Sequence, residues 1–178
     1  NVNEVIANRA TELLGGKKGE YFCHPNDHVN MAQSTNDVIP TAGKMTVLDL
    51  SKALLENLER LILAMEEKAT EFDDVIKMGR TQLQDAVPIR LGQEFQAYAN
   101  VLKRDHARIK NALCGMQAIN LGGTAIGTAI NAKKDYLQEI VPALVKECGH
   151  SLTRAEDLID STQNLDGFVS ASAALKTC

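Results

Sequence analysis

The sequence predicts an all-α protein built as a bundle of long helices. Two segments, one from Val47 to Phe72 and one from Leu91 to Met116, repeat apolar residues with the three-four spacing of a helix face. No segment shows the alternation that is typical of a strand. Because the apolar faces are wide, these helices should pack among other helices. We therefore predict a helical-bundle domain over residues 1–178.

The composition is that of a globular protein with its own core. The chain has 178 residues, of which 44% are hydrophobic and 24% are charged. A net charge of -4 and a content of 4% aromatic residues, with no Trp, disfavour a nucleic-acid surface. No apolar run is long enough to span a membrane. We expect neither nucleic acid nor membrane as a partner, so a small anionic ligand would need local hydrogen-bond donors.

The cysteines and the chain ends predict the setting of the protein. The four cysteines form no CxxC pair, and no signal-peptide pattern opens the chain. A reduced, cytoplasmic location is the simplest interpretation. There is no initiator Met, and the chain begins and ends inside helix-like sequence. We therefore expect a piece of a longer protein.

The first predicted elements are a helix over residues 1–14 and a loop over residues 21–33. The loop brings Cys23, His24 and Asp27 together, which are metal-ligand types. Pro25 and the residues after it favour a turn, however, and no second cluster supplies further ligands. We expect a turn that hydrogen-bonds to itself and no metal site.

The start of the long helix carries a cluster of short polar side chains. If Asp37 is the N-cap, Pro40 falls in the first turn, where its missing N–H costs no hydrogen bond. Ser34, Thr35 and Asn36 then lie at the positive end of the helix dipole, which favours a carboxylate or phosphate. The alternative is that these residues only cap the helix.

The second half of the chain continues the helical pattern. Residues 73–87 are predicted as a loop, and Pro88 should start the next long helix, whose apolar stripe contains Asp105 as its one polar member. The seven-residue regularity of that stripe also indicates contact with helices of other subunits. The glycine-rich residues 115–131 lack the GxGxxG spacing, so we expect a close-packed loop there.

The remaining elements are predicted in sequence order. Residues 132–147 should form a helix that Pro142 kinks or breaks and that ends at Gly149. Residues 151–163 should be a loop or short helix, and a final helix rich in small residues should follow over 165–175.

Four motifs resemble the fumarase/aspartase superfamily in order and spacing. They are His-Pro-Asn-Asp-His-Val-Asn from His24, Gln-Ser-Thr-Asn-Asp from Gln33, Gly-Arg-Thr-Gln-Leu-Gln-Asp-Ala-Val-Pro from Gly79, and Leu-Gly-Gln-Glu-Phe from Leu91. The resemblance covers essentially the whole chain. Gln82 after Thr81 resembles the aspartate ammonia-lyase branch, because fumarases carry His-Thr-Gln-Asp at that point.

The resemblance implies a homotetramer whose active sites each combine three subunits. Ser34, Thr35 and Asn36 match substrate-binding residues from one subunit, and Thr81 and Gln82 match those from another. The implied ligand is a small dicarboxylate, L-aspartate or fumarate, and no cofactor or metal is implied.

The reaction implied by the resemblance removes the proton beside the β-carboxylate of L-aspartate and then expels ammonia to leave fumarate. The intermediate carries a second negative charge on that carboxylate, so donors must already be in place. Ser34 and Thr35 suit this role, and Asn36 and Thr81 suit the region of the amino group.

No residue of the chain matches the family's general base, a serine in a glycine-serine loop with a downstream Lys-x-Asn. We expect that serine beyond Cys178, and the first substrate-binding threonine motif before Asn1. The chain should therefore be a central-domain fragment that contributes no catalytic residue and is inactive alone.

Two other functions remain open at this point. A class II fumarase would hydrate fumarate to malate, and His24, Asn26 and Asp27 match a peripheral anion site of fumarases. A non-catalytic structural bundle, like the lens proteins of the superfamily, would have no need of polar residues at Ser34 and Thr81.

Overall fold

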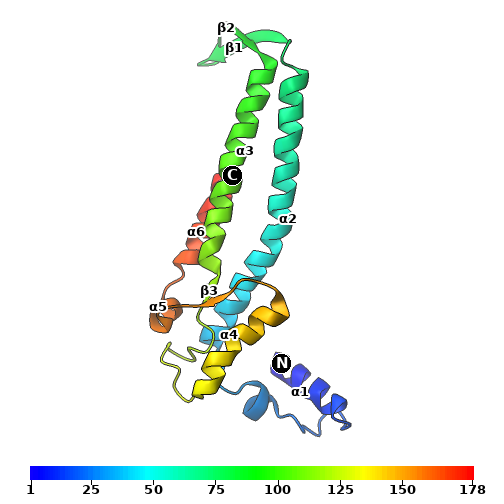
Figure 1. The fold of residues 1–178 in the computed structure, drawn as a ribbon, viewed down its shortest axis with the longest axis vertical. Coiled ribbons are helices and arrows are strands. Elements are labelled where there is room, and N and C mark those ends of the chain that lie inside the picture. Colours follow the sequence, from blue (N-terminus) through cyan, green and yellow to red (C-terminus); the bar gives the residue numbers. More distant parts are fainter. The chain divides into compact units, whose positions relative to one another are not determined.

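A computed structural model describes all 178 residues and divides them into two compact units. Unit 1 contains residues 1–44 and 117–165, and unit 2 contains residues 45–116 and 166–178. The chain is mostly helical (Figure 1), which confirms the all-α prediction. The helices are α1 (Val2–Leu13), the π-helix η1 (Pro25–Val29), α2 (Thr35–Glu71), α3 (Leu91–Leu113), the short 3-10 helix η2 (Cys114–Met116), α4 (Lys134–Cys148), α5 (Leu158–Gln163) and α6 (Asp166–Thr177).

The strands are few and short. An antiparallel pair consists of β1 (Ile76–Thr81) and β2 (Gln84–Arg90), and a parallel pair consists of β3 (Ala118–Ile119) and β4 (Thr153–Arg154). No strand was predicted, so the prediction from the sequence was wrong for all four strands. The pair β3–β4 is only two residues long, which is too short to leave an alternating pattern.

Unit 2 is a helical hairpin with a third helix added to it. Residues 45–71 of α2 lie beside α3, and α6 packs against α3 (Figure 1). The buried centre contains Leu58 and Ile62 of α2, Ile109 of α3 and Ala174 of α6. The predicted apolar faces of the two long helices therefore meet, as expected from their spacing.

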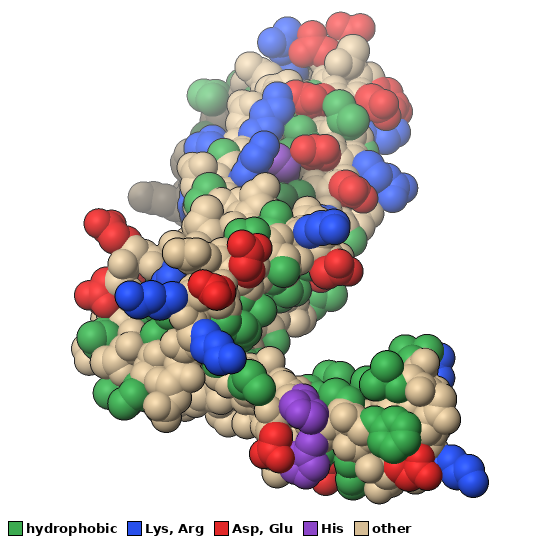
Figure 2. Space-filling model, turned by 60° about the horizontal axis from the view of Figure 1, so that its bottom comes forward, with side chains coloured by type: hydrophobic (Ala, Val, Ile, Leu, Met, Phe, Trp, Pro, Cys, Tyr) green, Lys and Arg blue, Asp and Glu red, His purple; other side chains and the backbone are tan.

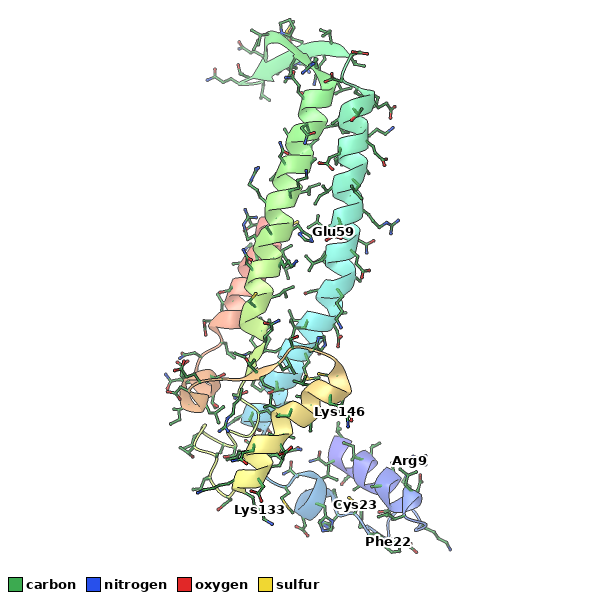
Figure 3. The ribbon with its side chains drawn as sticks, in the orientation of Figure 1. Arg9, Phe22, Cys23, Glu59, Lys133 and Lys146 are labelled. Carbon is green, nitrogen blue, oxygen red and sulfur yellow. The ribbon has the colours of Figure 1, made fainter.

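Close polar contacts join the two long helices beside this core. His106 Nε2 lies 3.1 Å from Glu59 Oε1, and Lys103 Nζ contacts Glu66 Oε1. Figure 3 shows Glu59 on the side of α2 that faces α3. Asp105, the polar member of the apolar stripe, is only 3% exposed and pairs with Arg108 one turn away on α3.

The predicted loop over residues 73–87 is mostly a β-hairpin. Its two turn residues, Gln82 and Leu83, have φ of 51° and 63°, the left-handed conformation of a type I′ turn. Pro88 lies in β2 opposite Met78 and does not start a helix, so that prediction was wrong. Helix α3 begins at Leu91 instead, and Gln93 Oε1 accepts a hydrogen bond from Arg90 N at 3.0 Å.

In unit 1 the glycine-rich segment packs against α4 and α5. Residues 119–124 are all buried, which confirms the prediction of a close-packed loop for this part. Helix α4 does not break at Pro142 and ends at Cys148, followed by the C-cap Gly149, whose φ is +69°. Figure 3 shows Lys133 where α4 starts and Lys146 near its other end. No helix of the chain is both long enough and apolar enough to cross a membrane.

Candidate functional site

The polar cluster begins with a capped helix. Helix α2 starts at Thr35, and Ser34 Oγ accepts a hydrogen bond from Asn36 N at 3.2 Å. In return, Asp37 Oδ1 accepts from Ser34 N at 2.8 Å. Asp37 is thus the third helical residue, and its prediction as N-cap was wrong. The Ser-x-x-Asp spacing of a capping box was the sequence signal for this arrangement.

Pro40 lies inside α2, beyond the first turn where it was predicted. An N–H at position 40 would donate to the carbonyl oxygen of Asn36, and proline has none. Asn120 supplies the missing donor, because its Nδ2 lies 3.0 Å from Asn36 O. The same nitrogen also donates to Thr162 Oγ1 at 3.0 Å. A side chain from the glycine-rich segment therefore replaces a helix hydrogen bond.

Asp37 is fully buried, with 0% of its surface exposed. Its Oδ2 accepts hydrogen bonds from Gly122 N at 3.1 Å and from Thr124 N at 3.0 Å. Together with Ser34 N, three backbone N–H groups hold this carboxylate at the positive end of α2. The start of the helix is thereby tied to the glycine-rich segment.

The three predicted substrate-binding residues of unit 1 lie together next to Asp37 at the start of α2. Asn36 Nδ2 donates to Ala125 O at 2.7 Å, which fixes the side chain and leaves its Oδ1 as an acceptor. Thr35 is exposed, and no hydrogen bond involves its hydroxyl. Ser34 Oγ accepts one hydrogen bond and keeps its own proton to donate. The arrangement offers two hydroxyl donors and one amide oxygen at a helix N-terminus.

The other two predicted residues lie in unit 2. Thr81 is the last residue of β1 and pairs with Gln84, and Gln82 occupies the turn. Both are exposed. The structure therefore groups the five predicted residues into two sets, one in each compact unit.

The segment around His24 forms the self-bonded turn that was predicted. It is the π-helix η1, and His24 Nδ1 accepts from Asn26 N and Asp27 N at 3.3 and 3.2 Å. His28 Nδ1 accepts from His24 N at 2.8 Å. Cys23 lies just before this turn (Figure 3), and no group of three His, Cys, Asp or Glu residues could hold a metal ion.

Tyr136 was missed from the sequence. It lines a cavity of about 250 Å³ with Gln33 and Lys133, and its hydroxyl is buried without a hydrogen-bond partner. Burial, and then the negative charge of Asp37, raise the pKa of this hydroxyl above its ordinary value of 10.0. No local sequence pattern identifies Tyr136 as a residue of the site, because it comes close to Asp37 only when the chain folds.

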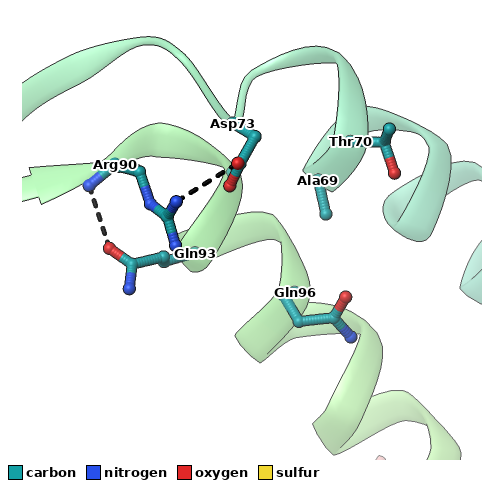
Figure 4. Close-up of a pocket in the computed structure, with 7 residues that line it drawn as sticks. Ala69, Thr70, Asp73, Arg90, Gln93 and Gln96 are labelled. Carbon is teal, nitrogen blue, oxygen red and sulfur yellow. Dashed lines mark hydrogen bonds and ion pairs between the residues drawn. The ribbon is translucent and has the colours of Figure 1, made fainter.

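A second cavity, of about 330 Å³, lies in unit 2 where α2 ends and α3 begins. Figure 4 shows Arg90 between Asp73 and Gln93, and Arg90 Nη1 lies 3.2 Å from Asp73 Oδ2. The two charges offset each other, so this cavity does not favour an anion. Figure 2 likewise shows acidic and basic side chains interspersed on the face in view.

Comparisons with known proteins give the family. A family model described as lyase matches residues 1–178. Aspartate ammonia-lyase of Bacillus subtilis is 52% identical over 179 residues, which are 100% of this chain and 38% of that protein.

Two solved structures show the same fold. A fumarate lyase:delta crystallin from Brucella melitensis, bound to cobalt, has a TM-score of 0.93 and 49% identity over 98% of this chain and 38% of its own. A class II fumarase from Schistosoma mansoni has a TM-score of 0.91 and 34% identity over 99% of this chain and 40% of its own. The chain thus spans well under half the length of these proteins. It belongs to the lyase family, in the fumarase/aspartase superfamily, and is similar to the aspartate ammonia-lyases.

Proposed function

We propose that the full-length protein carrying this chain is an aspartate ammonia-lyase, which reversibly converts L-aspartate to fumarate and ammonia. The observation that carries the proposal is the pair of hydroxyls of Ser34 and Thr35 at the start of a 37-residue helix. The Thr35 hydroxyl has no partner in the fold, so it is available to a ligand. The 52% identity to a protein of that name supports the same choice.

The chemistry asks for hydrogen-bond donors at one carboxylate. A base removes the proton beside the β-carboxylate, the electron pair moves onto that carboxylate, and it then returns to form the double bond as the C–N bond breaks. Ser34 and Thr35 would donate to the carboxylate while its charge grows, and the helix dipole would add to this. Each preorganised donor is worth on the order of 10²- to 10³-fold in rate.

The substrate's ammonium group needs acceptors. We assign Asn36 Oδ1 to it, because the amide nitrogen of the same side chain is already used by Ala125 O. Thr81 and Gln82, exposed on the hairpin of unit 2, would supply further polar contacts from another subunit. His24, Asn26 and Asp27 remain candidates for a peripheral anion site.

Assembly into a homotetramer is part of the proposal. In unit 2, Leu54, Leu61 and Tyr98 are 39%, 41% and 51% exposed on the long helices. We expect partner subunits to cover this apolar surface. Because no residue here matches the family's base serine, we expect the 178-residue chain alone to show no turnover.

The test is Thr35→Val in the full-length protein. We expect kcat for ammonia release to fall by roughly 10²-fold, as for loss of one donor to a developing anion. The melting temperature should barely change, because the Thr35 hydroxyl makes no hydrogen bond in the fold. Thr153→Val, at an exposed threonine of β4, is the matched control and should keep full activity. A fully active Thr35→Val enzyme would refute the assignment of Thr35 as a donor to the carboxylate.

Class II fumarase is the second candidate, because the Schistosoma mansoni enzyme shares the fold at a TM-score of 0.91. The two functions differ in the leaving group, water against ammonia. Incubating fumarate with ammonium ions and measuring malate and aspartate separates them, and we expect aspartate. A protein that forms neither product would instead be a non-catalytic structural bundle.

A further inference from the structure

We propose that Asp37, with Asn120, is a positioning residue of this site and holds Ser34, Thr35 and Asn36 in the geometry that binds substrate. The inference rests on the proposed function of those three residues and assigns no contact between Asp37 and substrate. Asp37 and Asn120 are both buried, and together they form what we call the buried layer of the site.

The carboxylate of Asp37 divides its two oxygens between two pieces of chain. Oδ1 accepts from Ser34 N at 2.8 Å, and Oδ2 accepts from Gly122 N at 3.1 Å and Thr124 N at 3.0 Å. The side chain is 0% exposed, so water cannot replace any of these donors. Asp37 therefore fixes the backbone of Ser34 relative to the glycine-rich segment.

Asn36 is held to the same segment by two further hydrogen bonds. Its carbonyl oxygen accepts from Asn120 Nδ2 at 3.0 Å, and its side chain donates to Ala125 O at 2.7 Å. Thr35 lies between two residues that are each anchored to residues 120–125. Its own hydroxyl needs no partner in the fold, since the backbone on both sides is fixed.

Only a carboxylate can complete this arrangement. An asparagine at position 37 has one acceptor oxygen, and its NH₂ group would face at least one backbone N–H. Asp37→Asn, which keeps the size of the side chain, must therefore release either Ser34 or the loop pair Gly122 and Thr124. A shift of about 1 Å in a site of this kind can cost roughly 10²-fold in rate.

The experiment compares Asp37→Asn with Asp157→Asn in the full-length protein. Asp157 is a control for helix capping at an exposed position, because its Oδ1 alone caps a helix of unit 1, accepting from Ile159 N at 2.8 Å and Asp160 N at 3.1 Å. We expect Asp37→Asn to lower kcat for ammonia release at least 10-fold with little change in KM. Asp157→Asn should keep its kcat and most of its stability, because the one oxygen that asparagine retains can still accept both hydrogen bonds.

Hydrogen exchange gives a readout that does not need activity. In Asp37→Asn, the peptide containing Ser34 or the peptide containing Gly122 and Thr124 should exchange at least 10-fold faster, and the peptides of α4 should not. If Asp37→Asn does not fold, Asn120→Ala is used in its place. It should lower kcat in the same way and speed exchange around Asn36.

The outcomes separate the two proposals. Equal kcat for Asp37→Asn and Asp157→Asn, or unchanged exchange at both peptides, overturns the positioning role. A wild-type protein that releases no ammonia from aspartate overturns the proposed function instead, and the exchange result then decides the positioning role alone.

Discussion

The replacement of a helix hydrogen bond by Asn120 can be tested by combining two substitutions, Pro40→Ala and Asn120→Ala. In the native chain, Asn36 O receives its hydrogen bond from Asn120 Nδ2 because Pro40 has no N–H. With alanine at position 40, the helix itself offers an N–H to that oxygen. The free energy that the Asn120 side chain contributes to folding should therefore depend on whether residue 40 is proline.

The expected magnitudes follow from the hydrogen bonds involved. Asn120→Ala in the native background removes the donors to Asn36 O and Thr162 Oγ1 and leaves the former unpaired, which costs about 2–3 kcal/mol. In the Pro40→Ala background, Asn36 O keeps a donor, so the same substitution should cost about 1 kcal/mol less. The buried Asn120 Oδ1, which has no partner, is lost in both backgrounds and cancels from the difference.

The assay is urea unfolding of the four proteins of this cycle, followed by NMR signals of unit 1. Thr162→Val serves as the control, because it removes the other acceptor of Asn120 and should show no dependence on residue 40. A coupling energy of about 1 kcal/mol supports the replacement. Strictly additive effects would contradict it, because Asn120 would then stabilise the fold independently of the missing N–H.

Two further predictions concern packing and pH. Gly92→Ala should destabilise unit 2 by about 2 kcal/mol or more, because its Cβ would lie 2.2 Å from the backbone oxygen of Ala69. Gly115→Ala, whose nearest new contact is 3.6 Å away, should change stability by less than about 0.5 kcal/mol in the same urea titration, and equal effects would refute the clash. Because the pKa of Tyr136 is raised, the folded state binds its proton more tightly than the unfolded state, so stability should fall as pH rises above 10.0. Tyr136→Phe should reduce that fall in pH-dependent melting, and an unchanged slope would contradict the assignment.

The sequence predicted what local patterns encode. The long helices follow from apolar spacing that extends over many turns, and Ser34, Thr35 and Asn36 are neighbours in the chain. The β1–β2 hairpin was missed for two physical reasons. Most of its residues are exposed, so no core selects an alternating pattern, and its turn residues Gln82 and Leu83 are not the glycine or asparagine that usually mark such turns.

The buried layer of the site could not be predicted in the same way. The partners of Asp37 lie 85 and 87 residues further along the chain, and Asn120 reaches back across 84 residues to Asn36. No periodicity records such pairs. The capping-box spacing of Ser34 and Asp37 was visible in the sequence, but it indicates only the local half of the arrangement.

The two units are built from sequence segments that alternate along the chain, which affects the order in which each unit is completed on the ribosome. Unit 1 is made from residues 1–44 and 117–165, so the hairpin and α3 of unit 2 emerge before unit 1 is complete. Unit 2 in turn waits for α6, at the very end of this segment. At about 5–20 residues per second, the 85 residues between Asp37 and Gly122 take roughly 4–17 s to translate. During that time Asp37 can pair only with Ser34 N, because its other donors, Gly122 N and Thr124 N, have not yet been made.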